Sequence, residues 1–273
     1  MKNYIKITNT IKPFKKKISI EGDKSLSIRW ALLASQATGN SKSFNLLKSE
    51  DVLNTLKCLK QLGVKVKLYQ NYCEIIGLGL NGFKYNKNII LNAGNSGTLG
   101  RLIMGLLIHS KTDVKIIGDK SLSKRDFLRV TKPLKMFGAK FKTNSGKLPI
   151  IVKGTDSAKP VNYYESKGSA QCKSSVMLAT LNTKGSTTIK AKKSRNHTEL
   201  LFKYLDLPIK IKKKKNYDLI KIVGQKKFKS FNYKIPSDIS SSAFFIVLTA
   251  LSKNSELTIK NVNINPTRIG ILK

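Results

Sequence analysis

Strand-like stretches and apolar segments with helical spacing alternate along this chain, and their order repeats. Four strand-like stretches each run into a turn of small residues and then into an apolar segment with helical spacing. The helices that follow the four stretches are expected to begin near Ser25, Gly97, Ser169 and Ser241. The differences 97 − 25, 169 − 97 and 241 − 169 all equal 72, which indicates an internal repeat. The strand-like stretches are residues 17–20, 88–91, 161–164 and 231–235.

Each repeat continues with further elements in a constant order. A second strand is predicted at residues 43–46, 114–117, 187–189 and 257–259, and a second helix at residues 51–62, 126–137 and 197–205. Each second helix ends in a turn and a strand, which together occupy residues 62–66, 137–141 and 207–211. A last strand closes each unit at Gly77, Gly154 and Gly224. Gly63 and Gly138 fit helix ends that require a left-handed residue.

The unit therefore reads β-α-β-α-β-β, which predicts an α/β (α+β) fold. Because each unit has one sheet face and two helices to bury, several units must pack around shared helices. Simple strand–helix alternation of a common α/β fold is the plainer alternative. The fourth unit reaches only the start of its second helix, at residues 267–273, so the sequence is expected to be truncated after about three and a half units.

The net charge of the chain bears on its binding partner but does not identify one. Lys and Arg total 52 against 15 acidic residues in 273, a formal net charge of +37, which predicts attraction to polyanions. The lysines are scattered, however, and the dense runs 15–17 and 212–215 lie beside strand-like segments, as expected of solvated loops. The chain is also rich in Asn and Ile, so a compositional bias of the source genome could explain much of the charge.

Few residues are available for metal or disulfide chemistry. Cys58, Cys73 and Cys172 are isolated thiols, and there are two histidines, His109 and His197, so neither a disulfide framework nor a metal site is predicted. The first residues, 1–4, lack the apolar run of a signal peptide, and the apolar stretch around residues 243–247 is too short to span a bilayer. These features predict a soluble cytoplasmic protein without a membrane partner.

The predicted helix starts carry the candidate chemistry. Free N–H groups and the helix dipole favour anions at a helix N-terminus, especially beside a cation. The candidate segments are Lys24 and Ser25 with Arg29, residues 94–98 with Arg101, residues 168–171 with Lys173, and the turn 123–125. Any one of these segments alone is more simply an N-cap or a surface charge. Their recurrence at matching positions predicts one pocket for a small ligand with two or more negative groups.

These same residues carry a resemblance to a known family. Residues 24–29 (K-S-L-S-I-R) resemble the K-S-x-S-x-R element of 5-enolpyruvylshikimate-3-phosphate synthases, and residues 94–101 resemble their G-N-x-G-T-x-x-R segment. The likeness is collinear over essentially the whole chain. Further matching segments are residues 122–125, 169–174 (S-A-Q-C-K-S), 194–199 (S-R-N-H-T-E), 238–244 and 265–268.

The resemblance implies two similar domains of three units each, which close on substrates between them. Residues 22–235 would form one complete domain, whereas residues 1–21 and 236–273 would belong to the other. The implied reaction transfers the enolpyruvyl group of phosphoenolpyruvate to the 5-hydroxyl of shikimate 3-phosphate and releases phosphate. It needs no cofactor and no metal, and the resemblance implies a monomer at full length.

Site roles follow from the matched motifs. Lys24, Ser25, Arg29, Ser169, Ala170, Gln171 and Arg195 would contact shikimate 3-phosphate, and Lys24, Gly97, Arg125 and Gln171 would contact phosphoenolpyruvate. A methyl group at the position of Gly97 is associated in the family with tolerance of glyphosate, which implies an inhibitor-sensitive pocket here. The family's acidic base and several cations that clamp phosphoenolpyruvate have no counterpart in these residues, so this chain is expected to show no appreciable turnover.

Three other functions stay open at this point. A nucleotide-sugar enolpyruvyl transferase would share the repeat, but would carry a reactive cysteine in an arginine-rich loop and lack K-S-x-S-x-R. A nucleic-acid-binding repeat protein would exploit the charge, but aromatic residues are sparse (8%) and are not interleaved with the basic runs. A non-catalytic ligand-binding protein of this fold is the third.

Overall fold

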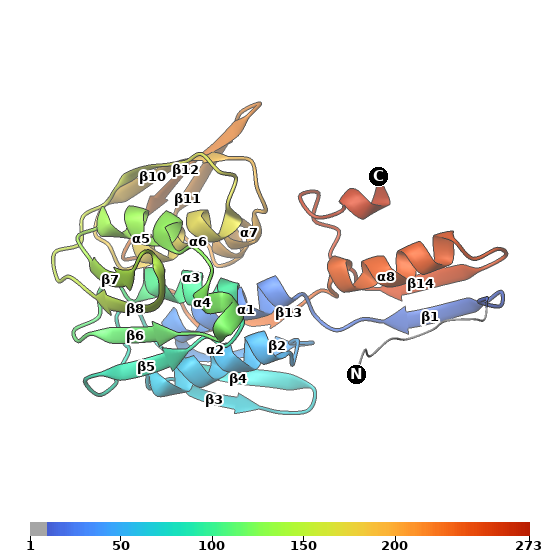
Figure 1. Ribbon diagram of the computed structural model, residues 1–273, viewed down its shortest axis with the longest axis horizontal. Helices are drawn as coiled ribbons and strands as arrows, with labels where there is room; N and C mark the ends of the chain where they lie inside the picture. Colours follow the sequence, from blue (N-terminus) through green and yellow to red (C-terminus); the bar gives the residue numbers. More distant parts are fainter. Residues whose placement is uncertain (1–9) are drawn as a thin grey trace.

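A computed structural model describes residues 10–273. Residues 1–9 lie outside this range, and with them the predicted absence of a signal sequence at residues 1–4 and part of the predicted segment 1–21. Within the described residues, no helix is both long and apolar enough to span a bilayer. The chain folds into alternating strands and helices with several small sheets, as the α/β prediction requires (Figure 1).

Three four-stranded sheets repeat one strand order. In each sheet, the first two strands run parallel and the remaining neighbours are antiparallel. The constant order is the structural form of the 72-residue repeat. The sheets are β13 (Asn232–Lys234), β2 (Thr38–Phe44), β4 (Tyr72–Leu78) and β3 (Lys65–Leu68); β5 (Ile89–Asn92), β6 (Val114–Ile117), β8 (Lys147–Lys153) and β7 (Lys140–Asn144); and β9 (Asn162–Glu165), β10 (Ser186–Lys192), β12 (Tyr217–Val223) and β11 (Ile209–Lys213).

The first and fourth units exchange their first strands. β1 (Lys15–Ser19) leaves the first unit and pairs in parallel with β14 (Glu256–Lys260). β13 takes the vacated place beside β2, with Asn232 opposite Lys42. The two crossing segments run next to each other, and the backbone N–H of Asp23 donates to the carbonyl of Pro236 at 2.8 Å.

The first helices of three units form the shared interior. α1 (Lys24–Gln36), α3 (Gly97–Leu106) and α6 (Ala170–Leu181) are buried along most of their length. α3 and α6 pack most closely, because a Cβ atom on Gly105 would lie only 2.2 Å from the carbonyl oxygen of Ser175. The predicted packing of units around common helices is confirmed.

The second helices are amphipathic and cover the sheets. They are α2 (Glu50–Gln61), α5 (Leu128–Lys135) and α7 (His197–Tyr204), and a short helix α4 (Lys120–Ser123) precedes α5. Gly63 and Gly138 end α2 and α5 with φ values of +87° and +106°, so the prediction of left-handed residues there is confirmed.

Several predicted elements differ from the structure in extent or in type. The helix predicted at 126–137 starts at Leu128, because a carboxylate oxygen of Asp126 accepts the N–H of Leu128 and forms a turn. The strand predicted at 43–46 begins at Thr38 and ends before Asn45, whose φ is +58°. Residues 267–273 contain one 3-10 turn, η1 (Gly270–Leu272), in place of the start of an α-helix.

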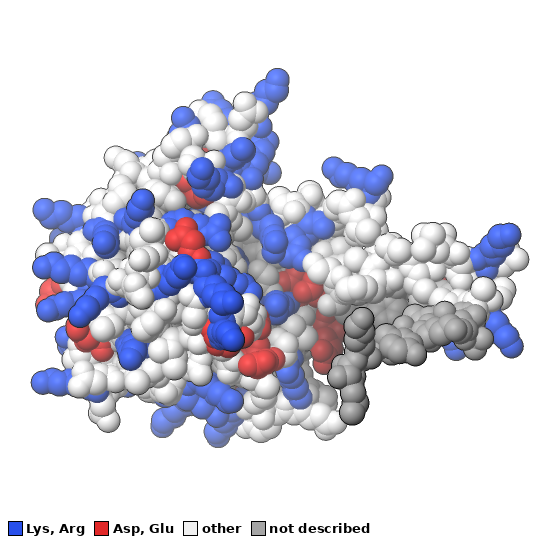
Figure 2. Space-filling view, viewed as in Figure 1, with Lys and Arg blue, Asp and Glu red and all other residues white. Residues whose placement is uncertain are grey.

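Residues 236–273, which include α8 (Ile239–Ala250) and β14, project together with β1 from the body formed by the three sheets and form an arm (Figure 1). α8 corresponds by repeat position to α1, α3 and α6, yet large apolar side chains here face water: Phe244 is 79% exposed, and Leu251, the C-cap of the helix, is 81% exposed. In the space-filling view this arm is largely uncharged (Figure 2). The arm therefore presents an apolar surface that the other first helices keep buried.

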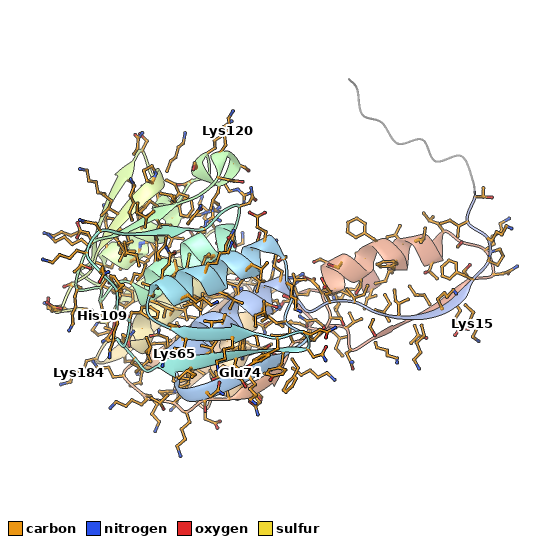
Figure 3. The ribbon with its side chains drawn as sticks, turned by 90° about the horizontal axis from the view of Figure 1, so that it is seen from below. Lys15, Lys65, Glu74, His109, Lys120 and Lys184 are labelled. Atoms are coloured by element: carbon orange, nitrogen blue, oxygen red, sulfur yellow. The ribbon has the colours of Figure 1, made fainter. Side chains whose placement is uncertain are left out.

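Basic side chains cover the body without forming one stripe. Lys and Arg atoms are spread over the visible face (Figure 2), and Lys15, Lys120 and Lys184 lie on widely separated parts of the surface (Figure 3). The dense basic runs are exposed, as expected, but the expectation of loops was wrong, since residues 15–17 lie in β1 and residues 212–213 lie in β11.

Candidate anion-binding site

A cavity of about 940 Å³ lies where α1 and α6 begin. Its wall also includes the segment around Asp238 and the residues Thr267 and Arg268, which come from the arm. Asp238 is the acidic residue among those that line it, against seven cations, so the cavity is strongly positive. The cations are Lys24, Arg29, Arg129, Lys167, Lys193, Arg195 and Arg268.

Helix starts contribute part of the wall, as predicted. The side chain of Ser169 accepts the N–H of Cys172 at 3.3 Å and caps α6, while its own N–H donates to Glu165. Ser169 therefore acts as an N-cap, and Ala170 and Gln171, which follow it in α6, also line the cavity. Ser25 plays a different part, because its hydroxyl accepts a hydrogen bond from Arg29 at 2.6 Å.

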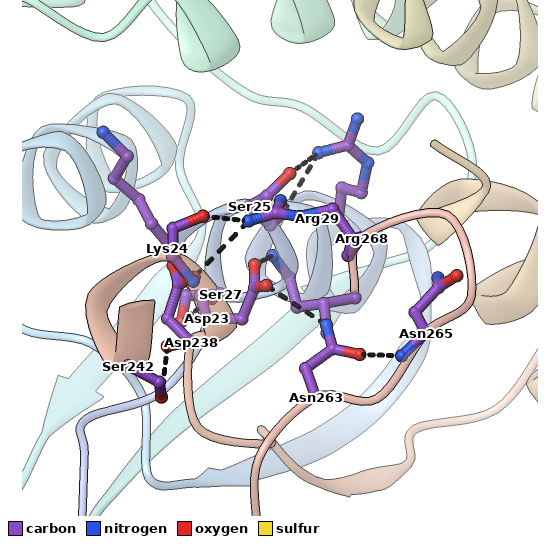
Figure 4. Close-up of polar contacts among 12 residues, drawn as sticks. Asp23, Lys24, Ser25, Ser27, Arg29, Asp238, Ser242, Asn263, Asn265 and Arg268 are labelled. Carbon is purple, nitrogen blue, oxygen red and sulfur yellow. Dashed lines mark hydrogen bonds and ion pairs between the residues drawn. The ribbon is translucent and has the colours of Figure 1, made fainter. Parts of the chain in front are cut away.

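Lys24 lies at the rim of the cavity (Figure 4). Its Nζ pairs with a carboxylate oxygen of Asp51 at 3.0 Å, and its backbone N–H donates to Asp238 at 3.2 Å. About half of the lysine side chain is exposed, so the ammonium group can exchange Asp51 for a more negative ligand.

Arg29 points into the cavity from one helical turn further along α1. It is only 3% exposed, and burial lowers the pKa of its guanidinium to about 10, although Glu199 and Asp23 act in the opposite direction. The group therefore remains protonated at neutral pH. A buried, charged guanidinium beside a cavity is a strong site for a carboxylate or a phosphate.

Gln171 connects this cavity to the start of α3. Its Oε1 accepts a hydrogen bond from Arg101 at 2.9 Å, and its Nε2 donates to Thr98 at 3.0 Å. A Cβ atom on Gly97 would lie 2.7 Å from Nη1 of Arg101 and 3.2 Å from Nη1 of Arg125. The glycine thus leaves room for two guanidinium groups.

The predicted site residues consequently form two adjoining groups. Lys24, Ser25, Arg29, Ser169, Ala170, Gln171 and Arg195 all line the cavity. Gly97 and Arg125 do not line it; they lie together at the start of α3, where Arg125 donates to Asn95 at 3.3 Å.

Several lining residues were missed at the sequence level. Arg268 binds Asp238 at 3.4 Å and also Ser240, and both ends of this contact come from the arm (Figure 4). The Asn-Pro-Thr-Arg motif signalled Arg268 without giving it a role. Arg129 could have been found from its place on the first turn of α5, whereas Lys167 and Lys193 belong to no motif.

His197 lies beneath the cavity and is almost fully buried. Neither ring nitrogen has a hydrogen-bond partner among residues 10–273. Burial, and next the neighbouring charge of Arg29, lower its pKa to about 3. The imidazole is therefore neutral at physiological pH and adds no charge to the site.

The arrangement suits binding of a small polyanion more than acid–base or thiol chemistry. The carboxylate of Asp238 is engaged by Arg268 and by the N–H of Lys24. Burial raises the pKa values of Cys58 and Cys73 to about 12, which keeps them as thiols.

Comparisons with known proteins agree with this geometry. The sequence profile of the EPSP synthase (3-phosphoshikimate 1-carboxyvinyltransferase) family matches residues 8–273. The 3-phosphoshikimate 1-carboxyvinyltransferase of Ruthia magnifica subsp. Calyptogena magnifica is 42% identical over 256 residues, which is 93% of this chain and 58% of that protein. The namesake from Thermoanaerobacter sp. (strain X514) is 42% identical over 259 residues, 93% of this chain and 59% of that protein.

A solved structure gives the same result. The EPSP synthase from Acinetobacter baumannii superimposes with a TM-score of 0.87 at 36% identity, over 96% of this chain and 58% of that one. The chain thus spans about three-fifths of the length of the relatives it matches. From the repeat, the fold and the profile match, this chain belongs to the EPSP synthase (3-phosphoshikimate 1-carboxyvinyltransferase) family.

Proposed function

We propose that this chain provides the shikimate 3-phosphate side of an enolpyruvyl transferase site. The complete reaction moves the enolpyruvyl group of phosphoenolpyruvate to the 5-hydroxyl of shikimate 3-phosphate and releases phosphate. Relatives that carry the name 3-phosphoshikimate 1-carboxyvinyltransferase, at about 42% identity, support this assignment.

The observation that carries the proposal is the convergence of Lys24, Arg29 and Arg195 on one cavity. Shikimate 3-phosphate has a carboxylate on C1 and a phosphate on C3 of a small ring. Cations that reach the cavity from separate elements can hold both groups at once, and guanidinium groups bind them in bidentate fashion. The start of α6 at Ala170 and Gln171 adds backbone N–H donors for the phosphate, since the N–H of Ser169 is already bound to Glu165.

The second substrate belongs to the adjoining group of residues. We place phosphoenolpyruvate near Gly97 and Arg125, with Lys24 and Gln171 between the two ligands. Gln171 supports this placement, because it touches residues of the α3 start and also lines the main cavity. Concentrated positive charge would offset the repulsion between two anionic substrates and hold them in reacting orientation.

The domain division is part of the same proposal. We infer one complete domain at residues 22–235, and a second domain to which residues 1–21 and 236–273 belong. The exchange of β1 and β13 supports it, because each strand leaves its own unit to join the other side. We further infer that this chain alone gives no turnover, because Asp238, the acidic residue among the described residues that line the cavity, is bound to Arg268 and to the N–H of Lys24.

Two further properties complete the proposal. We infer a cytoplasmic enzyme, because the three cysteines at positions 58, 73 and 172 are free thiols, and a monomer at full length. A nucleotide-sugar transferase is disfavoured, since all three thiols are buried and the Cys58 and Cys73 groups stay protonated.

Isothermal titration of the chain with shikimate 3-phosphate tests the proposal. Saturable binding is expected, with an affinity that Lys24→Ala reduces at least about tenfold, since one charge-assisted contact is lost. Lys184→Ala is the matched control, because Lys184 lies outside the cavity lining, and it should leave the affinity unchanged. Preferential binding of a nucleotide sugar or of single-stranded DNA would replace this function with one of the alternatives, and phosphate release at the rate of an intact relative would contradict the expected lack of turnover.

A further inference from the structure

Two of the three residues that accept hydrogen bonds from the Arg29 side chain come from outside its own unit. Its Nε donates to the hydroxyl of Thr198 at 2.8 Å, and its Nη2 donates to the hydroxyl of Ser174 at 3.1 Å. Thr198 lies on α7 and Ser174 on α6, both in the third unit, whereas Arg29 lies on α1. The guanidinium is therefore oriented by side chains about 145 and 169 positions away.

The two hydroxyls are themselves fixed. Ser174 and Thr198 share a hydrogen bond of 2.7 Å, and each is about 1% exposed. The adjacent residues Lys173 and Glu199 form an ion pair of 2.5 Å between the same two helices. α6 and α7 are thus joined at two successive positions directly under Arg29, which leaves the hydroxyl pair little freedom to move.

We propose that Thr198, with Ser174, is a positioning residue that aims the guanidinium of Arg29 into the cavity. Neither hydroxyl lines the cavity, so neither is expected to touch a ligand. Nε and one N–H of Nη2 donate to these two hydroxyls, and Nη1 donates to both the hydroxyl and the carbonyl of Ser25. The one remaining N–H, on Nη2, is therefore left for a ligand in the cavity, and this orientation is preorganised before the ligand arrives. The proposal rests on the assigned function only for the identity of that ligand.

The experiment compares substitutions by titration with shikimate 3-phosphate. Thr198→Val removes the acceptor and keeps the shape, so the dissociation constant should rise about tenfold or more, as for loss of a hydrogen bond to a charged group. Thr198→Ser restores the acceptor and should rescue binding. Thr180→Val is the matched control, because Thr180 is equally buried on α6 but its hydroxyl binds only the carbonyl of Val176.

A double-mutant cycle separates positioning from general damage. In an Arg29→Lys background, which lacks the Nε donor, Thr198→Val should weaken binding by less than about twofold. Equal weakening in both backgrounds, or unchanged binding of Thr198→Val in the parent chain, would overturn the proposal.

A ligand-free measurement keeps the inference separate from the assigned function. The Nε–H of Arg29 should give a resolved, exchange-protected NMR signal in the parent chain and in Thr198→Ser, and should lose that protection in Thr198→Val. If the parent chain binds no shikimate 3-phosphate, the proposed function fails while this signal still tests the positioning. An Nε–H signal that is equally protected in Thr198→Val contradicts the positioning, whatever the ligand.

Discussion

Lys173 of α6 and Glu199 of α7 pair at 2.5 Å, with side chains that are 1% and 3% exposed. The second oxygen of Glu199 has no hydrogen-bond partner among the described residues. Each charge therefore depends on the other for compensation in a nearly dry environment.

Glu199→Gln should consequently destabilise the fold strongly. It leaves the Lys173 ammonium buried without a counter-charge, and a loss of about 3–5 kcal/mol in the free energy of unfolding is expected. Urea denaturation measures it. The double variant Lys173→Met with Glu199→Leu removes both charges and should lose much less, about 1 kcal/mol. Single and double variants of equal stability would show that the pair is not buried as described.

Gly105→Ala should test the close approach of α3 and α6. A Cβ atom there would lie 2.2 Å from a backbone oxygen that cannot rotate away, so the helices must separate. The expected cost is about 2–3 kcal/mol in the free energy of unfolding. Gly270→Ala is the control, because a Cβ atom there meets nothing within 4 Å, and it should change stability by less than about 0.5 kcal/mol. A Gly105→Ala variant as stable as this control would contradict the packing.

Gly97→Ala should act on binding more than on stability. The new methyl group meets the ends of two flexible side chains, Arg101 and Arg125, which can move. With shikimate 3-phosphate bound, the affinity for phosphoenolpyruvate should fall about tenfold, while that for shikimate 3-phosphate changes little. Titration calorimetry gives both values. Gly100→Ala, where a Cβ atom would lie 3.4 Å from Phe127, is the matched control in the same helix, and a similar loss in both variants would argue against the placement.

His197 should make folding sensitive to acid. Its pKa in the folded chain is about 3, below the ordinary value of 6.5, so between these values the unfolded chain binds a proton that the folded chain does not. The contribution of the neutral His197 imidazole to the free energy of unfolding is fully present above pH 6.5 and is lost as the pH falls toward 3. The slope can reach about 1.4 kcal/mol per pH unit, the limit for one proton. Urea midpoints at several pH values should fall less steeply for His197→Gln than for the parent chain. Parallel curves would mean that the ring is already protonated in the fold.

The apolar surface of α8 should bind hydrophobic probes. Replacing the exposed Phe244 and Leu251 by serine should lower the fluorescence of a bound naphthalene dye by about half, because exposed patches of this kind adsorb such ligands. Stability should change by less than about 1 kcal/mol. Met136→Ser is the control, because Met136, the C-cap of α5, is also exposed (50%) but lies on the body. If the dye fluorescence is the same in the parent chain and in the α8 variant, the apolar surface that binds the dye lies elsewhere.

The repeat could be predicted from the sequence because it depends on local patterns. Helical spacing of apolar residues and left-handed glycines such as Gly63 are encoded within a few positions. The helix starts around Lys24 and Ser169 were found for the same reason, since capping residues lie next to the elements they cap.

The parts of the fold and of the site that local patterns did not predict depend on contacts between distant segments. Residues 15–19 carry no local signal that they pair with residues 256–260, and only the family resemblance placed the two segments in one domain. The placement of Arg268 in the cavity, and of Thr198 under Arg29, follows from how units pack and has no local signal. Even the shifted start of α5 results from one side-chain contact, that of Asp126 with the N–H of Leu128.

The exchange of strands also dictates an order of events during protein synthesis. The second and third sheets each draw all four strands from one continuous stretch, so each can close soon after it emerges from the ribosome. The first sheet cannot, because the edge of β2 must wait for β13, and contacts there join residues 190 positions apart. The earliest-made part of the chain is therefore among the last to be finished, and its exposed β2 edge is the point where a nascent chain is most open to pairing with a neighbour.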